Sequence, residues 1–465
     1  MIPVECPNEN YDESVDQEPR SKRWEKVDLG FINKIFRLVF HITSDKEAGV
    51  CTILTTVAMY IFDIVTDIIV ACNLFYVQKY GFGCIVLIVD YLPGWALIMH
   101  NTFSETWRTV TTSKDKVVSI SLLLLSPFSS ALCHFRWLVE FESADEDWFN
   151  YLHHNSRLSQ LLNVSYESPL QVVIILILWG NGSFELPWSK HTYEDSQGRQ
   201  VGIYPGLFSL IISSLSILIG SIDISEGRIW QETLIVFAYA LCDYLFRLPT
   251  IALLVLYFGI EWSSIIFLSL IIVSLILMRW YDQLKRQEIS TITSVLLAPI
   301  SPFIASDQAN LYQRTDLNET SNKHRRELSV LISRATISIL FLSNIILYLL
   351  LVYKNDFITP SMETTLIMDK ESTEKILYML LLPLGGFIVV SNLIYYIVIL
   401  SCRKSTINPQ PNMNQENQPN QEVKSKLIMY AQVTLAILVI IGVISLFCVA
   451  TYYVAKGSRG KIKKK

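Results

Sequence analysis

Long apolar blocks separated by short polar segments make up most of the chain. A helix needs about 20 apolar residues to cross a bilayer core, and most of the blocks reach or approach that length. The blocks cover 49–73, 81–101, 117–140, 165–181, 203–222, 232–258, 262–281, 332–353, 375–401 and 427–455. This pattern predicts an all-α fold, a polytopic transmembrane helical bundle with about eight to ten spans.

Two apolar segments are expected not to cross the membrane simply. Residues 291–305 are apolar but short and contain two prolines, which predicts a re-entrant or broken helix. Residues 117–140 contain the sequence SPFSSALCHFR and could also enter without crossing cleanly. The number of spans therefore stays open by one or two crossings.

Composition agrees with a membrane protein and excludes several classes. Hydrophobic residues make up 51% and charged residues 17% of the chain, and the mean hydropathy is +0.37, which excludes a soluble multidomain enzyme. The net charge of −4 gives no basic field for nucleic acid. The eight cysteines are scattered, and no phosphate-binding loop or catalytic motif is found. We therefore expect no enzyme activity, no metal site, no cofactor and no ATP-driven transport.

Polar segments divide the chain into five parts. Residues 1–48 form a polar tail of mixed charge, expected to be cytosolic and regulatory, and residues 49–405 form the transmembrane domain. Residues 406–426 are rich in Asn, Gln and Pro and are expected to be a disordered linker. An additional hydrophobic helix over 427–455 and a basic tail over 456–465 follow.

Loop charge predicts which side each loop faces. Basic residues gather before the first block, between 285 and 334, and at 403–404, so these segments are expected in the cytosol. The loops 183–202 and 354–374 are expected outside. The basic C-terminal tail then conflicts with one more crossing from a cytosolic linker. Either the last block does not cross simply, or one side is assigned wrongly.

Ionisable residues inside the apolar blocks are the candidate functional residues, because each costs about 2.5–3.5 kcal/mol at the centre of a membrane helix. Asp63 and Asp67 share one helix face and need cations, water or protons. The other candidates are Asp90, Arg136, Glu167, Asp223 and the Asp243–Arg247 pair. They can be internal salt bridges that lock helices together, or they can form a polar track through the bundle. The neighbouring His153 and His154 are expected on the surface.

Several of these segments resemble the XK-related family over residues 49–405. The resembling segments are FDIVTDIIVACNLFYVQKYGFG, CHFRW, ESPLQVVI, SIDIS, FRLPTIALLVLYF and ILYMLLLPLGGFIVVSNLIYYIVIL. The chain departs from the family pattern at Asn163, where a second acid is expected, and in the block 427–455, which lies beyond the usual family end.

The resemblance implies an ATP-independent phospholipid scramblase, which exposes phosphatidylserine on the plasma membrane of apoptotic cells. On this hypothesis six charged residues line or gate the lipid pathway: Asp63, Asp67, Arg136, Glu167, Asp223 and Arg247. The alternative within the family is a non-scrambling membrane subunit or transporter, bound to a single-span partner protein. A homodimer is a possible assembly in place of the single-span partner, and an enzyme that acts on lipid is the remaining alternative.

The N-terminal tail contains a segment that resembles a caspase recognition sequence. It reads Asp-Glu-Ser-Val-Asp over residues 12–16, followed by Gln17, and an exposed tail is accessible to proteases. We expect a caspase to cut after Asp16, as the family resemblance implies. Removal of the acidic tail could free the basic segment 20–46 to bind anionic lipid. The alternative is an acidic tail that matches by chance.

Overall fold

A helical membrane bundle forms the fold. The computed structural model describes residues 30–103, 125–180, 191–203, 205–223, 230–280, 319–353 and 374–390, apart from 77, 126, 142, 145 and 195–199. Within this part of the chain, five helices are long and apolar enough to cross a membrane: Asp45–Tyr76, Tyr80–Leu97, Trp148–Gly180, Leu241–Gly259 and Ile332–Leu350. Gly206–Gly220 and Ser263–Leu277 are shorter apolar helices. The predicted fold class is confirmed.

The first long helices form an antiparallel pair. Helix α3 (Asp45–Tyr76) begins after Ser44, whose Oγ accepts a hydrogen bond from the Glu47 backbone N–H at 3.4 Å, an arrangement typical of a capping box. The helix ends where Gln78 adopts φ 60° and the Lys79 N–H donates to the Leu74 carbonyl at 2.8 Å, as in a Schellman motif. Helix α4 (Tyr80–Phe103) then packs back along α3.

A short helical hairpin packs against the first part of α3. Helix α7 (Ser129–Glu140) has 12 residues, or ~18 Å, and is too short to cross a bilayer alone. Helix α8 (Glu146–Leu162) follows it, and a buried aromatic cluster joins the hairpin to Ile53 of α3. His153 is 8% exposed and packs on Trp137 with 5.0 Å between ring centroids. The prediction of a surface His153 is wrong, because α8 is polar in composition but buries this face.

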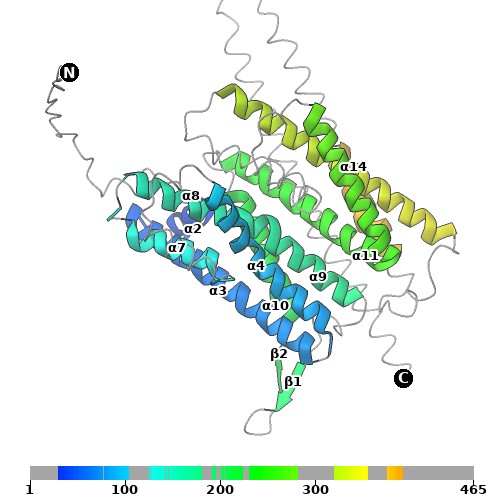
Figure 1. Ribbon diagram of the computed structural model, residues 1–465, viewed down its shortest axis with the longest axis horizontal. Helices are drawn as coiled ribbons and strands as arrows, with labels where there is room; N and C mark the ends of the chain where they lie inside the picture. Colours follow the sequence, from blue (N-terminus) through cyan, green and yellow to red (C-terminus); the bar gives the residue numbers. More distant parts are fainter. Residues whose placement is uncertain are drawn as a thin grey trace, which may run out of the picture.

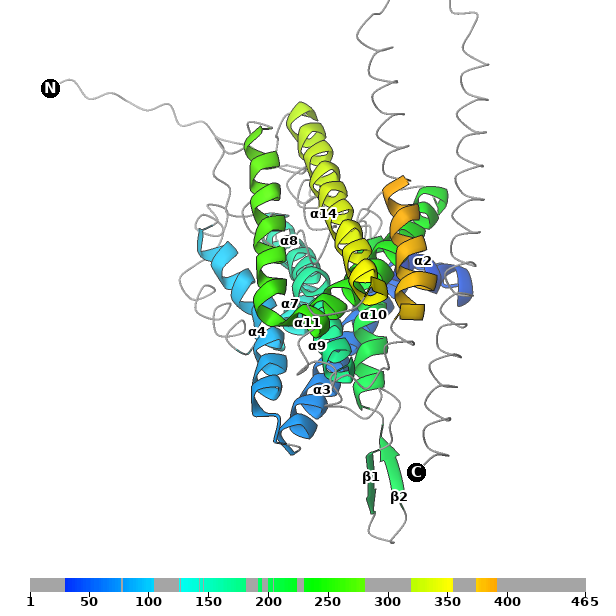
Figure 2. The ribbon, with the colours of Figure 1, turned by 90° about the vertical axis from the view of Figure 1, so that its right-hand side faces the viewer.

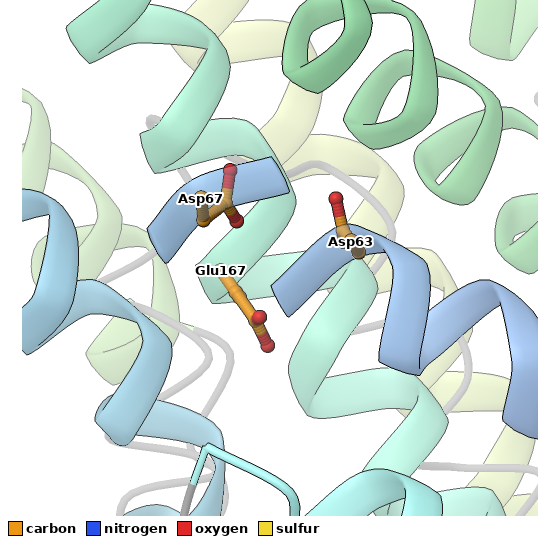
Figure 3. A group of neighbouring side chains, drawn as sticks. All are labelled: Asp63, Asp67 and Glu167. Carbon is orange, nitrogen blue, oxygen red and sulfur yellow. The ribbon is translucent and has the colours of Figure 1, made fainter. Parts of the chain in front are cut away.

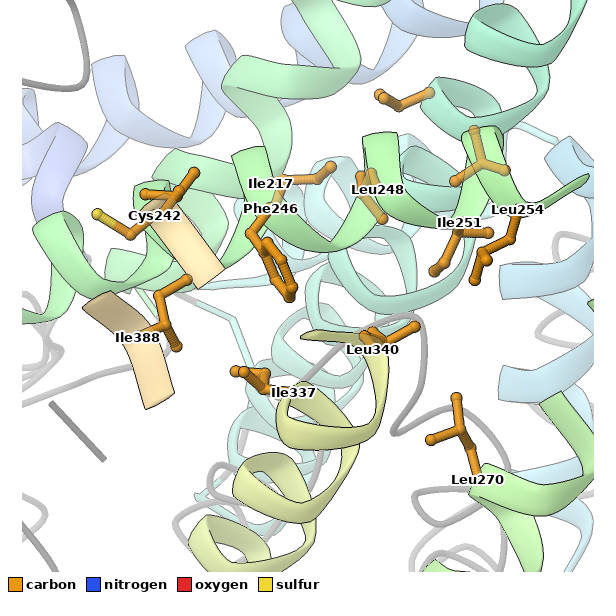
Figure 4. Close-up of a cluster of buried hydrophobic side chains, with 13 residues drawn as sticks. Ile217, Cys242, Phe246, Leu248, Ile251, Leu254, Leu270, Ile337, Leu340 and Ile388 are labelled. Atoms are coloured by element: carbon orange, nitrogen blue, oxygen red, sulfur yellow. The ribbon is translucent and has the colours of Figure 1, made fainter. Parts of the chain in front are cut away.

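Helix α9 (Ser168–Gly180) lies at the centre of the bundle. It continues from α8 through a π-helical turn, η2 (Asn163–Glu167), and it contacts α4, α11 (Trp230–Trp280) and α10 (Pro205–Asp223). Helix α14 (Glu319–Tyr353) packs on α11, and a second π-helical turn, η5 (Leu377–Leu381), contacts α14. Figure 4 shows the apolar core between these helices, with Phe246 and Leu340 near its middle.

Helix α11 is two helices joined at a sharp break. Gly259 has φ 74° and ψ 172°, which is not helical backbone. The two apolar blocks 232–258 and 262–281 meet at this residue, so the structure separates them where the sequence does.

A two-stranded antiparallel hairpin extends from one end of the bundle. Strand β1 (His191–Glu194) pairs with β2 (Gln200–Ile203), with Glu194 opposite Gln200. The hairpin lies at the end where α3 meets α4, and α2 (Gly30–Val39) and α7 lie at the other end (Figures 1 and 2). The pattern of apolar and polar residues did not predict these strands.

Several predicted segments lie outside the described residues. They are the tail with Asp16, the start of the block 117–140 (residues 117–124), the re-entrant segment 291–305, the linker 406–426, the helix 427–455 and the basic tail 456–465. Their structures stay predictions.

Candidate functional site

Asp63 and Asp67 of α3 face two serines of α10. The Ser213 hydroxyl donates to Asp63 Oδ1 at 3.2 Å, and the Ser209 hydroxyl donates to Asp67 Oδ1 at 2.6 Å. Both pairs are spaced by four residues, so each occupies one face of its helix. Both carboxyl groups are buried, with Asp67 at 0% exposure.

Glu167 reaches the same place from the π-helical turn η2. Asn163 Nδ2 donates to Glu167 Oε2 at 2.6 Å. Asn163 Oδ1 in turn accepts hydrogen bonds from the hydroxyl groups of Ser168 at 3.1 Å and of Ser216 at 3.0 Å. Asn163 therefore fixes the Glu167 carboxylate and ties the turn to α10.

The three acids converge in the middle of the bundle. Each of Asp63, Asp67 and Glu167 offers one carboxylate oxygen, and these oxygens lie within 4.8 Å of one another (Figure 3). Asp90 of α4 interacts with Asp67 through its side chain and accepts a hydrogen bond from Gln171 of α9. We call these four residues, Asp63, Asp67, Asp90 and Glu167, the carboxylate cluster.

The cluster concentrates negative charge away from water. In the part of the chain that the structure describes, the donors that reach it are neutral hydroxyl and amide groups. No hydroxyl or amide group there donates to three of its oxygens, the Oδ2 atoms of Asp63, Asp67 and Asp90. Four ionised carboxylates at these separations repel one another strongly in a low-dielectric interior. The cluster therefore holds protons between its members, or it binds a cation.

The donor chemistry suits a hard cation. Carboxylate oxygens supplied by several elements are the ligands that Ca²⁺ and Mg²⁺ prefer, and Asp63, Asp67 and Glu167 come from α3 and η2. No metal site was expected, because the sequence has no Cys and His residues at the spacing of metal ligands. Oxygen ligands brought together from distant segments leave no such spacing in the sequence.

A partly open cavity lies beside the cluster. It lies between α3, α10 and the end of α8 with η2 and encloses about 30 Å³. Asp63 is the member of the cluster that lines it, together with Tyr60, Gln160 and Ser216.

The other predicted pathway residues lie elsewhere. Arg136 pairs with Glu140 at 2.9 Å and lies over the Trp148 ring. Arg247 pairs with Asp243 at 3.0 Å inside α11, and both are about 1% exposed, which confirms the predicted i,i+4 pair. Asp223 is the last residue of α10, and its side chain lies outside the description. Of the six residues predicted for a common pathway, the structure brings together Asp63, Asp67 and Glu167.

Four residues of the site were not predicted as site residues: Asn163, Gln171, Ser209 and Ser213. The serines follow a pattern that the sequence contains, because Ser209, Ser213 and Ser216 repeat every three or four residues along an apolar helix. Such a polar stripe on a membrane helix indicates a face turned toward other polar groups.

Comparisons of the chain with protein-family models, with curated proteins and with solved structures found no match.

Proposed function

We propose that this chain is an ATP-independent phospholipid scramblase of the XK-related type. The observation that supports the proposal is the carboxylate cluster, which places polar groups inside the bundle beside a partly open cavity. Downhill lipid exchange needs a polar path for headgroups, while the acyl chains stay in the bilayer. Acids are costly inside a membrane and generally mark such paths.

Helix α3 has the two-sided character that this activity needs. Asp63 and Asp67 are buried, whereas Ile61, Phe62 and Val65 between and beside them are exposed. In a membrane-spanning helix, those exposed side chains contact lipid. Polar groups and the acyl-chain region are therefore separated by about one helix diameter, ~10 Å.

The proposal includes a proteolytic switch and a place of action. A caspase cut after Asp16 removes the acidic start of the N-terminal tail and activates lipid exchange, which exposes phosphatidylserine on the plasma membrane of apoptotic cells. The support is the sequence Asp-Glu-Ser-Val-Asp over residues 12–16 and the basic segment that follows it.

The test is transfer of fluorescent phosphatidylserine between leaflets of proteoliposomes, measured as loss of fluorescence to a membrane-impermeant reductant. Intact protein and protein cut after Asp16 are compared, with Asp16→Asn as the uncuttable control. We expect fast transfer after the cut and slow transfer in the control. Absence of transfer in both forms, with folded protein confirmed, would overturn the proposal and favour a subunit that needs a single-span partner.

A further inference from the structure

The cavity beside the carboxylate cluster has walls of two kinds. Thr56, Tyr60, Asp63, Gln160 and Ser216 supply polar groups, and Met59, Ile212 and Ile219 are among its apolar lining residues. Its enclosed space of about 30 Å³ is enough for one or two groups the size of a water molecule. A cavity of this size fits a single small polar group such as an ammonium, and its open side leaves room for the rest of a ligand outside.

Asp63 provides the strongest recognition element in this cavity. Its side chain is 2% exposed and lines the wall, and its Oδ1 accepts from Ser213. Its Oδ2 has no hydrogen-bond partner among the residues that the structure describes. A buried carboxylate oxygen without a donor is unfavourable, so this oxygen is suited to a ligand that donates.

Tyr60 places an aromatic ring next to this carboxylate. It precedes Asp63 by three residues, which puts both on one face of α3, and its ring packs on His134 with 5.3 Å between centroids. An aromatic ring beside a carboxylate is the combination that binds organic ammonium groups. A bare divalent ion would need six or more oxygen ligands, and here much of the wall is aliphatic.

We propose that this cavity binds a primary ammonium group, that of a phospholipid headgroup of the ethanolamine type. The ammonium donates to Asp63 Oδ2 and lies against Tyr60, and the rest of the headgroup extends through the open side of the cavity. The inference that the amine belongs to a lipid rests on the proposed function, whereas the preference for an amine rests on the residues that line the cavity. A serine headgroup carries the same ammonium and an additional carboxylate that the cluster would repel. An ethanolamine lipid therefore tests the contact of the ammonium without this repulsion.

Gly220 and Val164 control the size of this cavity. Both line it, and a Cβ atom on Gly220 would lie 2.1 Å from Val164 Cγ2. Gly220→Ala therefore forces Val164 to move, and Val164→Ala removes the atom that it meets. Gly220→Ala therefore crowds the site, and adding Val164→Ala restores the space. Neither substitution changes a charge.

The test is binding of soluble short-chain lipids to the full-length protein in a non-ionic detergent, measured by titration calorimetry. Dihexanoyl-phosphatidylethanolamine is compared with dihexanoyl-phosphatidylglycerol and with free ethanolamine. We expect the ethanolamine lipid to bind most tightly. Loss of a charge-assisted hydrogen bond in Asp63→Asn should weaken it by about tenfold or more. Asp45→Asn, which neutralises a surface acid in the first turn of the same helix, should bind within about threefold of the original chain.

The steric pair keeps the test decisive if Asp63→Asn does not fold. Gly220→Ala should weaken binding, and Gly220→Ala with Val164→Ala should recover it. Equal affinity for the two lipids, or unchanged binding in both Asp63→Asn and Gly220→Ala, would overturn the proposal. Free ethanolamine binding as tightly as the lipid would overturn the assignment to a headgroup.

Scrambling is measured on the same preparations, so that the two proposals fail separately. If lipid is transferred but the ethanolamine lipid is not bound preferentially, the proposal of an amine site is wrong and the scramblase proposal stands. If the ethanolamine lipid is bound preferentially but no lipid is transferred before or after the cut at Asp16, the scramblase proposal is wrong and the proposal of an amine site stands.

Discussion

Asp67 is a fully buried acid whose Oδ1 is held by Ser209 and which interacts with Asp90. Asp67→Asn keeps the shape of the side chain and removes its charge. If the carboxylate cluster serves lipid exchange, we expect the transfer rate of protein cut after Asp16 to fall by about tenfold, the size of one lost charge-assisted hydrogen bond. The readout is the proteoliposome assay, normalised to folded protein.

Asp45→Asn is the matched control for that substitution. Asp45 lies in the first turn of the same helix and pairs with Arg37 at the surface, so its loss should leave the transfer rate unchanged. Equal rates in Asp67→Asn and the original chain would show that the cluster has no part in transfer.

Asp243 and Arg247 form a buried pair whose two members depend on each other. Asp243→Leu leaves the buried Arg247 guanidinium without its carboxylate, which costs about 3–5 kcal/mol, whereas replacing both members by apolar residues is often neutral. We expect Asp243→Leu to unfold at much lower denaturant and Asp243→Leu with Arg247→Met to recover most of the loss. Unfolding in mixed detergent micelles with sodium dodecyl sulfate measures both. A double variant as unstable as the single one would contradict this account.

The sequence predicts interactions between side chains of one helix better than those between helices. The Asp243–Arg247 pair and the shared face of Asp63 and Asp67 follow from a spacing of four residues. The approach of Glu167 to those acids, about 100 residues away in the sequence, and the role of Asn163 follow from how η2 packs against α4, α8 and α10. At Asn163 the resemblance indicated only a missing acid, yet its amide both donates to Glu167 and accepts from Ser216.

At the scale of single elements, the break in α11 depends on one glycine. Gly259 combines φ 74° with ψ 172°, a backbone conformation that is strained for any residue with a Cβ atom. Gly259→Ala should therefore lower the free energy of unfolding by about 1–3 kcal/mol, measured in mixed micelles.

Gly81→Ala serves as the control for the effect of an added methyl group. Gly81 lies in the first turn of α4, and a Cβ atom there would meet no other atom within 4 Å. The free energy of unfolding of the Gly81→Ala variant should stay the same or rise by up to ~1 kcal/mol. If Gly259→Ala lowers the free energy of unfolding no more than Gly81→Ala does, the break tolerates ordinary side chains.

Sequence patterns located the apolar helices and missed the elements that depend on packing. The blocks 49–73, 81–101 and 332–353 correspond to α3, α4 and α14. The π-helical turn η2 and the burial of His153 could not be predicted in this way. They depend on which neighbour covers each face of α8, and the polar residues of that helix suggested water instead of protein.

For the whole molecule, the testable property is which end of the bundle faces the cytosol. The β hairpin and the start of α3 lie at opposite ends (Figures 1 and 2), and loop charge assigns the hairpin to the outside. In intact cells, a membrane-impermeant maleimide should label Thr192→Cys in β1. Thr43→Cys, just before α3, should react only after permeabilisation, with labelling of the original chain subtracted from both. The reverse pattern would invert the predicted orientation.

The serines and acids that join α10 to α3 are both spaced by four residues, about one helical turn. Ser209 meets Asp67, and Ser213 meets Asp63, so the two helices run antiparallel with a contact that repeats at the helix pitch. Sliding α10 by one turn, roughly 6 Å, would place Ser213 opposite Asp67 and preserve one of the two hydrogen bonds. Intermediate positions would preserve neither. Any sliding of α10 along α3 is therefore expected to occur in discrete steps of about one helical turn, with stable positions only where a serine lies opposite an aspartate.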